Sequence, residues 1–152
     1  MRHRTALLTT RLTTQLTARI NRYTIISMGL GLVYLWFGLL KFFSGLSPAE
    51  DLAGNTIEIL SFGLIGPRWG LLLLAAWESA IGILFFAGIC RKCVLRMALV
   101  HISCTFAPLF LLPGLCFTEF PFGLTLVGQY IIKNVVFVGV LLVLLRSEGT
   151  PG

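Results

Sequence analysis

Four long apolar stretches take up more than half of this sequence. A helix of about 20 residues crosses a hydrocarbon core of about 30 Å. Over the whole chain 57% of residues are hydrophobic and only 12% are charged, whereas a soluble domain carries about 25% charged residues. The sequence therefore predicts an all-α membrane protein with four transmembrane helices, over residues 23–43, 69–89, 94–112 and 124–145.

The basic residues predict the direction in which these helices cross the membrane. With the N-terminus inside, the cytoplasmic segments hold nine Lys and Arg residues, five of them before residue 23, and the outer loops hold only Arg68. Such an excess is typical of the cytoplasmic side. We therefore expect a four-helix, up-down-up-down bundle in a bacterial-type inner (plasma) membrane, with both termini in the cytoplasm.

The segment before the first apolar stretch, residues 1–22, is basic and amphipathic. Its apolar side chains recur every four residues, at Leu8, Leu12, Leu16 and Ile20. This predicts a helix that lies on the membrane surface against anionic lipid; a partly disordered basic tail is the alternative, because threonines lower helix propensity. The segment does not resemble a signal peptide, and no nucleic-acid-binding motif accompanies its charge.

The outer loop over residues 44–68 is expected to contain a short surface helix, at about 48–60. Ser47 precedes Pro48, and Glu50 follows Ser47 by three residues, which is typical of a helix N-terminus. After the fourth apolar stretch comes a polar tail, residues 146–152, so that residues 23–145 form the transmembrane domain.

Apart from Arg96, which is counted with the basic turn before the third stretch, four ionisable residues fall within the apolar stretches: Lys41, Glu78, His101 and Lys133. Each costs about 2.5–3.5 kcal/mol to insert, so each is a candidate for function. Counted along the helices, Glu78 and Lys133 lie about 13 Å below the outer surface, and Lys41 about 3 Å below it. Lys41 and Glu78 lean toward each other, because side chains tilt toward the N-terminus of their own helix. We expect one carboxylate to meet two ammonium groups.

This predicted cluster has two interpretations. A surplus positive charge would attract an anion, a quinone carbonyl or the carboxylate of a partner. A structural ion pair that holds the helices together explains the same residues, since buried charges must be partnered whatever the function.

Small residues predict which helical faces are buried. Gly31, Tyr34, Gly38 and Lys41 share one face of the first apolar stretch, and small residues of the second lie near Glu78, at Ala75, Ser79 and Gly82. Such faces let helix backbones approach closely in lipid. Tyr34 and Lys41 are therefore expected to face the interior, although packing alone also explains the glycines.

His101 lies about 10 Å above the cytoplasmic end of the third stretch and is expected to lean away from the cluster. It is a candidate proton relay or metal ligand, and a hydrogen bond to a backbone carbonyl freed by Pro108 is the alternative. The other histidine, His3, lies outside the apolar stretches. We predict no metal site, no haem held by two histidines and no redox centre in this chain.

The cysteines fall into two groups. Cys90 and Cys93 have the spacing of a redox pair and basic neighbours, but the predicted location is reducing and no thioredoxin-like unit surrounds them. Redox activity is therefore the weaker hypothesis for this pair. Cys104 and Cys116 are expected to fill space in the core.

Three short motifs follow one another at the ends or within the apolar stretches: Phe37-Gly38-Leu39-Leu40-Lys41-Phe42, Trp77-Glu78-Ser79-Ala80-Ile81-Gly82 and Gln129-Tyr130-Ile131-Ile132-Lys133-Asn134. In order and spacing they resemble the DoxX family of membrane proteins, over about residues 23–145. The resemblance implies a four-helix membrane bundle with Lys41, Glu78, Lys133 and Asn134 at its polar positions. It also implies a small subunit associated with quinone-linked thiosulfate oxidation, or a relative without assigned chemistry.

The basic N-terminal segment and the Cys90/Cys93 pair are not features of that family, which leaves open a specialised partner on the cytoplasmic side. We expect an accessory subunit of a quinone-linked or other redox membrane complex, more a non-catalytic subunit than a stand-alone enzyme. Its expected partners are other membrane subunits, with quinone as a possible ligand at an interface. The alternatives are a small anion or proton transporter or channel, and a purely structural subunit of a larger assembly.

Overall fold

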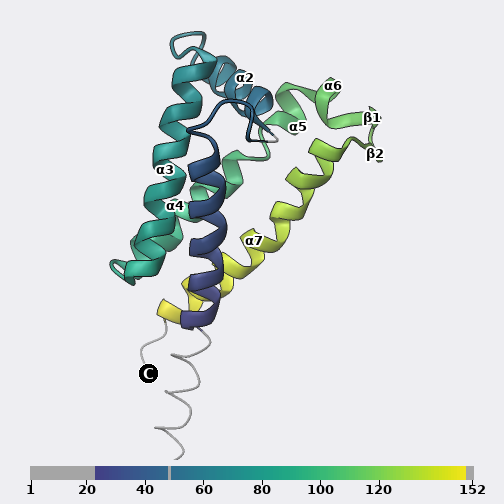
Figure 1. Cartoon of the computed structure of the whole chain (residues 1–152). Coiled ribbons are helices and arrows are strands. Elements are labelled where there is room, and N and C mark those ends of the chain that lie inside the picture. The colour runs from purple at the N-terminus through teal and green to yellow at the C-terminus, as the bar shows by residue number, and fades with distance from the viewer. Residues whose placement is uncertain (1–22, 48, 150–152) are drawn as a thin grey trace, which may run out of the picture.

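The computed structural model describes residues 23–47 and 49–149 (Figure 1). This part of the chain is mostly helical. Four helices are long and apolar enough to cross a membrane, over Tyr23–Leu40, Pro67–Ala87, Arg91–Leu111 and Leu126–Glu148. The prediction of four such helices is confirmed. The predicted surface segment and the last residues of the tail lie outside the described residues.

The second of these helices, α3, covers Pro67–Ala87 and has residues suited to both of its ends. Pro67 occupies the first turn, where the missing N–H of proline costs no hydrogen bond. Gly88 follows the last residue with φ 65°, a left-handed conformation that glycine adopts without strain. A short turn then leads into α4, Arg91–Cys104, which packs beside α3.

The third apolar stretch is broken near its end. After α4 ends at Cys104, the next helix, α5, covers Pro108–Leu111. Proline lacks an N–H, and its ring collides with the carbonyl four residues earlier. The predicted third span, residues 94–112, agrees with the apolar segment Arg91–Leu111, but a turn at residues 105–107 divides that segment into two helices.

The loop between the first helix and α3 contains α2, Glu50–Leu60, which packs against α3. Ser47 is not its N-cap, because Ala49 holds that position and makes no side-chain hydrogen bond there. The Glu50 carboxylate instead accepts a 2.6 Å hydrogen bond from the backbone N–H of Gly45. Glu50 thus closes the loop that leads into its own helix.

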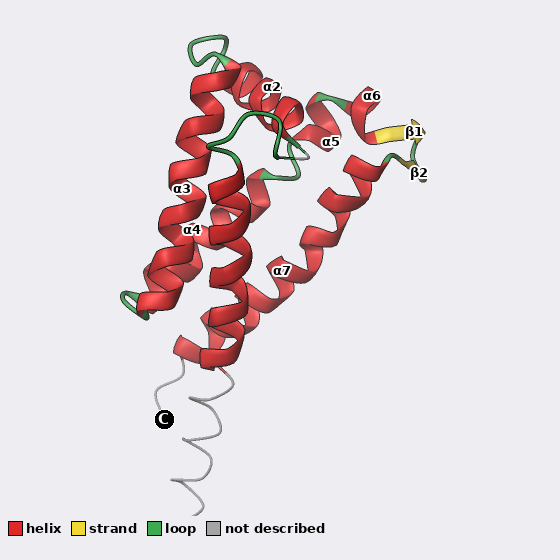
Figure 2. Cartoon of the chain, viewed as in Figure 1, coloured by secondary structure: helices red, strands yellow, loops and turns green. Residues whose placement is uncertain are grey.

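A small structure that the sequence did not predict lies between α5 and the last long helix (Figure 2). It consists of α6, Pro113–Cys116, and an antiparallel pair of strands, β1, Phe117–Glu119, and β2, Gly123–Leu124. Two- and three-residue strands give little hydrophobic periodicity, so a pattern search over longer windows does not find them.

The first helix, Tyr23–Leu40, packs closely against α3 through glycines. A Cβ atom on Gly38 would lie 2.7 Å from the backbone N of Ser79, and one on Gly82 would lie 2.6 Å from the backbone N of Leu35. Only residues without side chains permit this approach. The small-residue faces predicted for these two helices are therefore in contact with each other.

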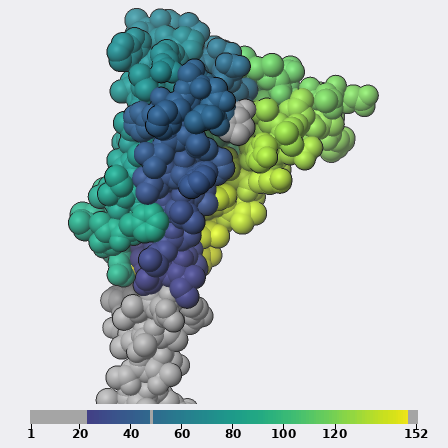
Figure 3. Space-filling view, in the orientation of Figure 1, coloured from purple at the N-terminus to yellow at the C-terminus, as the bar shows by residue number. Residues whose placement is uncertain are grey.

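The last helix, α7, covers Leu126–Gly149 and is tilted against the others (Figure 1). Its C-terminal half crosses α4, and its N-terminal half continues toward the strand pair as an arm (Figure 3). The α3–α4 turn and the C-terminal end of α7 lie at one end of the molecule, called the turn end here. The opposite end, which holds α2, α5, α6 and the strand pair, is called the α2 end.

Candidate functional site

An ion pair between Lys41 and Glu78 joins the end of the first helix to α3. Lys41 Nζ lies 2.6 Å from Glu78 Oε2, and the two side chains are 9% and 8% exposed. Lys41 also donates a 3.3 Å hydrogen bond to the carbonyl of Phe37, as expected for a side chain that leans toward the N-terminus of its helix. The predicted contact between Lys41 and Glu78 is therefore present.

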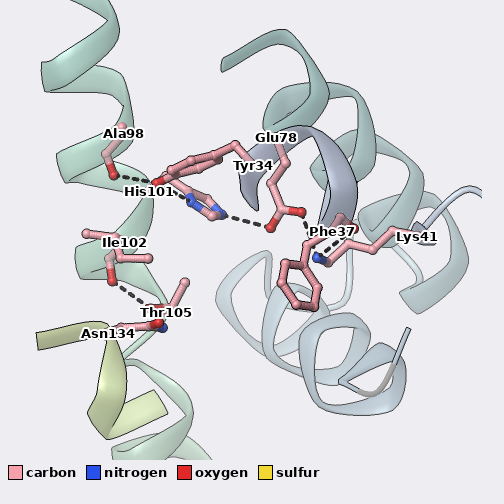
Figure 4. Close-up of polar contacts among 9 residues, drawn as sticks. All are labelled: Tyr34, Phe37, Lys41, Glu78, Ala98, His101, Ile102, Thr105 and Asn134. Carbon is pink, nitrogen blue, oxygen red and sulfur yellow. Dashed lines mark hydrogen bonds and ion pairs between the residues drawn. The ribbon is translucent and has the colours of Figure 1, made fainter. Parts of the chain in front are cut away.

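His101 on α4 is the second partner of Glu78 (Figure 4). Its Nε2 lies 3.3 Å from Glu78 Oε1, and its side chain is 10% exposed. The expectation that His101 leans away from Glu78 is wrong, because the two depths were counted from opposite ends of the bundle. Counted from the shared turn, Glu78 lies ten residues before Gly88 and His101 ten residues after Arg91, so the two are level.

Tyr34 on the first helix extends this network beyond His101. Its hydroxyl donates a 3.0 Å hydrogen bond to the carbonyl of Ala98 and lies 3.3 Å from His101 Nδ1. The two rings meet edge to face, with centroids 5.4 Å apart. Three helices thus place four side chains in one continuous row, Lys41, Glu78, His101 and Tyr34, which we call the polar chain (Figure 4).

Lys133 does not join the polar chain, and the prediction that it meets Glu78 is wrong. Its side chain is exposed, with Nζ 5.2 Å from the ring centroid of Tyr130. The buried face of α7 carries Ile131, and Lys133 lies two residues on, about 200° around the helix. The tilt of α7 also carries its N-terminal half toward the strand pair, so equal depth along the two helices does not bring their residues together.

Asn134 faces inward but contacts a different part of the molecule. Its Nδ2 donates a 2.8 Å hydrogen bond to Thr105 Oγ1, and Thr105 in turn donates to the carbonyl of Ile102 at 2.6 Å. Asn134 therefore ties α7 to the turn that precedes Pro108. Among the described residues, Asn134 makes no hydrogen bond to a side chain of the polar chain.

The cysteines are all free thiols. Cys90 and Cys93 are exposed where α4 begins, and a redox role stays the weaker hypothesis for this pair. Cys104 is exposed, so the expectation that it fills the core is wrong. Cys116 is fully buried, as expected, and burial raises the pKa of its thiol.

Two further features of the described residues bear on ligands. Within residues 23–47 and 49–149, no three His, Cys, Asp or Glu side chains gather closely enough to hold a metal ion. A hollow of about 520 Å³ opens at the α2 end, with Glu50, Asp51, Leu115 and Val127 in its wall. No side chain of the polar chain lines this hollow, so the two are separate features.

Comparisons with protein-family models, with curated proteins and with solved structures gave no match for this chain. The resemblance to the DoxX family therefore stays a prediction from the three motifs.

Proposed function

We propose that this chain is a DoxX-like inner-membrane protein that serves as a non-catalytic accessory subunit of a quinone-linked or other redox complex. Its four apolar helices support the membrane location. The contact between Lys41 and Glu78 supports the resemblance, because these residues come from two separate motifs that resemble those of the family. The proposed subunit has no redox centre of its own.

One observation carries the proposal: the ammonium group of Lys41 has a donor to spare. A lysine carries three N–H groups. Glu78 accepts one and the carbonyl of Phe37 accepts another, and the described residues supply no acceptor for the third. Lys41 directly follows the first helix, and the next five residues are exposed. The free N–H is therefore well placed to bind an oxygen of a quinone, an anion or a partner's carboxylate.

The membrane orientation is part of the proposal. The turn end of the described chain carries one acidic residue, Glu148, and four basic residues: Arg91, Lys92, Arg96 and Arg146. The α2 end carries Arg68 and four acidic residues: Glu50, Asp51, Glu58 and Glu119. Basic ends normally stay in the cytoplasm. We therefore assign an up-down-up-down bundle with cytoplasmic termini, in which residues 1–22 lie against anionic lipid and Lys41 opens toward the outer side.

A purely structural role is the second candidate, and one observation favours it. Lys41 and Glu78 neutralise each other, as a pair that only holds two helices together would. The contact of Glu78 with His101 fits both candidates, because the second oxygen of a buried carboxylate needs a hydrogen-bond donor whatever the function.

The variant Lys41→Met tests the proposal, because methionine keeps an apolar stem and removes the ammonium group. We expect Lys41→Met to lose the subunits that co-purify in mild detergent and the quinone extracted with them. The matched control is Lys133→Met, which removes an exposed lysine outside the polar chain and should keep both.

A folded protein is required for this test. If Lys41→Met is unstable, the double variant Lys41→Met/Glu78→Gln removes both charges of the pair and should restore folding but not the partner. The proposal is wrong if a folded Lys41 variant keeps its subunits and quinone, or if the natural protein purifies with neither.

A further inference from the structure

The hydroxyl of Tyr34 lies between two hydrogen-bond partners but has one proton to donate. The carbonyl of Ala98 lies at 3.0 Å and His101 Nδ1 at 3.3 Å. When Tyr34 donates to Ala98, its oxygen can only accept, so Nδ1 needs a proton of its own to complete the contact. When Tyr34 donates to His101, Nδ1 must be without a proton.

The other ring nitrogen faces a carboxylate. His101 Nε2 lies 3.3 Å from Glu78 Oε1, and an ionised carboxylate only accepts hydrogen bonds. The proton between these two atoms is therefore present in both arrangements of Tyr34. The two arrangements differ by one proton on His101 Nδ1 and by rotation of the Tyr34 hydroxyl, and the other atoms can stay in place.

We propose that His101 and Tyr34 form a switch that stores one proton on the imidazole ring of His101. In the loaded state His101 is an imidazolium that donates to Glu78 and to Tyr34, and Tyr34 donates to Ala98. In the unloaded state His101 is neutral with its proton on Nε2, and Tyr34 donates to Nδ1. Loading takes one proton from water; no electrons move and no bond between heavy atoms changes.

The groups around His101 suit such a switch. Glu78 from α3 and Tyr34 and Lys41 from the first helix are the titratable side chains of the polar chain. From α7, Asn134 bonds Thr105 one turn further along and does not titrate, and Lys133 points away. Because Lys41 and Glu78 balance each other, the stored proton adds one positive charge beside a carboxylate oxygen that is not bonded to Lys41.

The polar chain opens toward one end of the molecule only. Beyond Tyr34, toward the turn end, the helices are packed with apolar side chains that are at most 5% exposed, including Leu30, Phe85, Val94, Leu95 and Leu141. The buried hydroxyl of Ser27 on that side lies seven residues from Tyr34, about 10 Å along the helix and beyond hydrogen-bond reach. In the other direction Lys41 adjoins the exposed residues 42–46.

The use of this switch rests on the proposed function, in which a ligand or partner bound at Lys41 responds to the charge stored on His101. Its existence can be tested on the purified chain alone. If the switch is absent, the co-purification result of Lys41→Met is unaffected. If Lys41→Met keeps its partners, the test of the switch is likewise unaffected.

Nitrogen NMR on the full chain in lipid bilayers tests the switch. The chain has two histidines, so His3→Gln leaves His101 as the single imidazole signal. Across the pH range in which the protein stays folded, we expect an imidazolium to convert to a neutral ring that is protonated on Nε2. In Tyr34→Phe the neutral-ring Nδ1 resonance should shift to that of a nitrogen without a hydrogen bond. The matched control, Tyr130→Phe, should leave it unchanged.

Three results would overturn the switch: a neutral ring protonated on Nδ1, a ring that never changes protonation, or an Nδ1 resonance that Tyr34→Phe does not shift.

Discussion

Glu78 and His101 stand level with each other on neighbouring helices, with 3.3 Å between Oε1 and Nε2. On its other oxygen, Glu78 bonds Lys41 at 2.6 Å. One buried carboxylate therefore connects the first helix and α4 through α3, and it is the residue on which the polar chain depends.

Replacing Glu78 by Gln should destabilise the protein by about 3–5 kcal/mol, because it leaves the charge of Lys41 buried without its counter-ion. Adding Lys41→Met should recover part of this loss, since the unpaired charge is then absent. Unfolding in detergent, followed by circular dichroism, measures the single and double variants. Additive losses in the double variant would mean that the two residues are not energetically coupled.

Substitutions of Lys133 and Asn134, which are adjacent on α7, should change the unfolding free energy by different amounts. Lys133→Met should change the unfolding free energy by less than about 0.5 kcal/mol and show no coupling to Glu78→Gln, because Lys133 is exposed. Asn134→Leu should cost about 0.6 kcal/mol, and up to about 1.7 kcal/mol, because it removes a hydrogen bond between helices. Strong coupling between Lys133 and Glu78 in the same unfolding assay would contradict the rotation of α7 described above.

Lys133 and Asn134 show why the sequence could not predict which side chains of α7 face the interior. Lys133 and Asn134 are adjacent and therefore about 100° apart on the helix. Apolar residues surround them on all sides, as they do on any helix in lipid, so no polar face tells which of the two points inward. The tilt of α7 depends on packing between segments that are distant in the sequence, so no local pattern predicts it. The strands before α7 are too short to give a periodic pattern.

Other features could be predicted because they depend on local composition or on one helix. The apolar stretches predicted four helices long enough to span a membrane, and opposite side-chain leans predicted the contact of Lys41 with Glu78. The contact of Glu78 with His101 was missed, although counting both residues from the turn at Gly88 would have found it. Pro108 was recognised within the third stretch, but the break that it causes was not predicted.

Because the first helix packs closely on α3, a larger residue in place of Gly82 should destabilise the protein. A Cβ there would lie 2.6 Å from the backbone of Leu35, so Gly82→Ala should force the helices apart and cost about 1–3 kcal/mol. Gly29→Ala is the control, since nothing lies within 4 Å of a Cβ at that position. Thermal unfolding in detergent compares them, and equal midpoints would show that this contact is looser than described.

The thiols should differ in their reaction with a maleimide. A thiolate is the reacting form, and burial raises the pKa of Cys116, which lowers its thiolate fraction at any given pH. Cys93 is exposed and should be modified first. Single-cysteine variants in detergent, assayed by mass spectrometry over rising pH, should show Cys116 reacting only at more alkaline pH or after unfolding. Equal rates in the folded protein would show that Cys116 is accessible.

Membrane orientation can be tested at two exposed positions on opposite ends of the molecule. Leu64, in the loop between α2 and α3, is 87% exposed, whereas Ser47 in the same outer region is only 9% exposed and would label poorly. In a chain without other cysteines, Leu64→Cys should react with a membrane-impermeant maleimide added to intact spheroplasts. A chain that retains only Cys93, beside the basic residues of the turn end, should react only after lysis. As a control for thiol access, the Leu64→Cys chain and the chain that retains only Cys93 must both react in detergent. If Cys93 reacts in intact spheroplasts and Leu64→Cys does not, the orientation is the reverse of the one proposed. Lys41 and the α2 end would then face the cytoplasm. The four helices and the polar chain do not depend on this result.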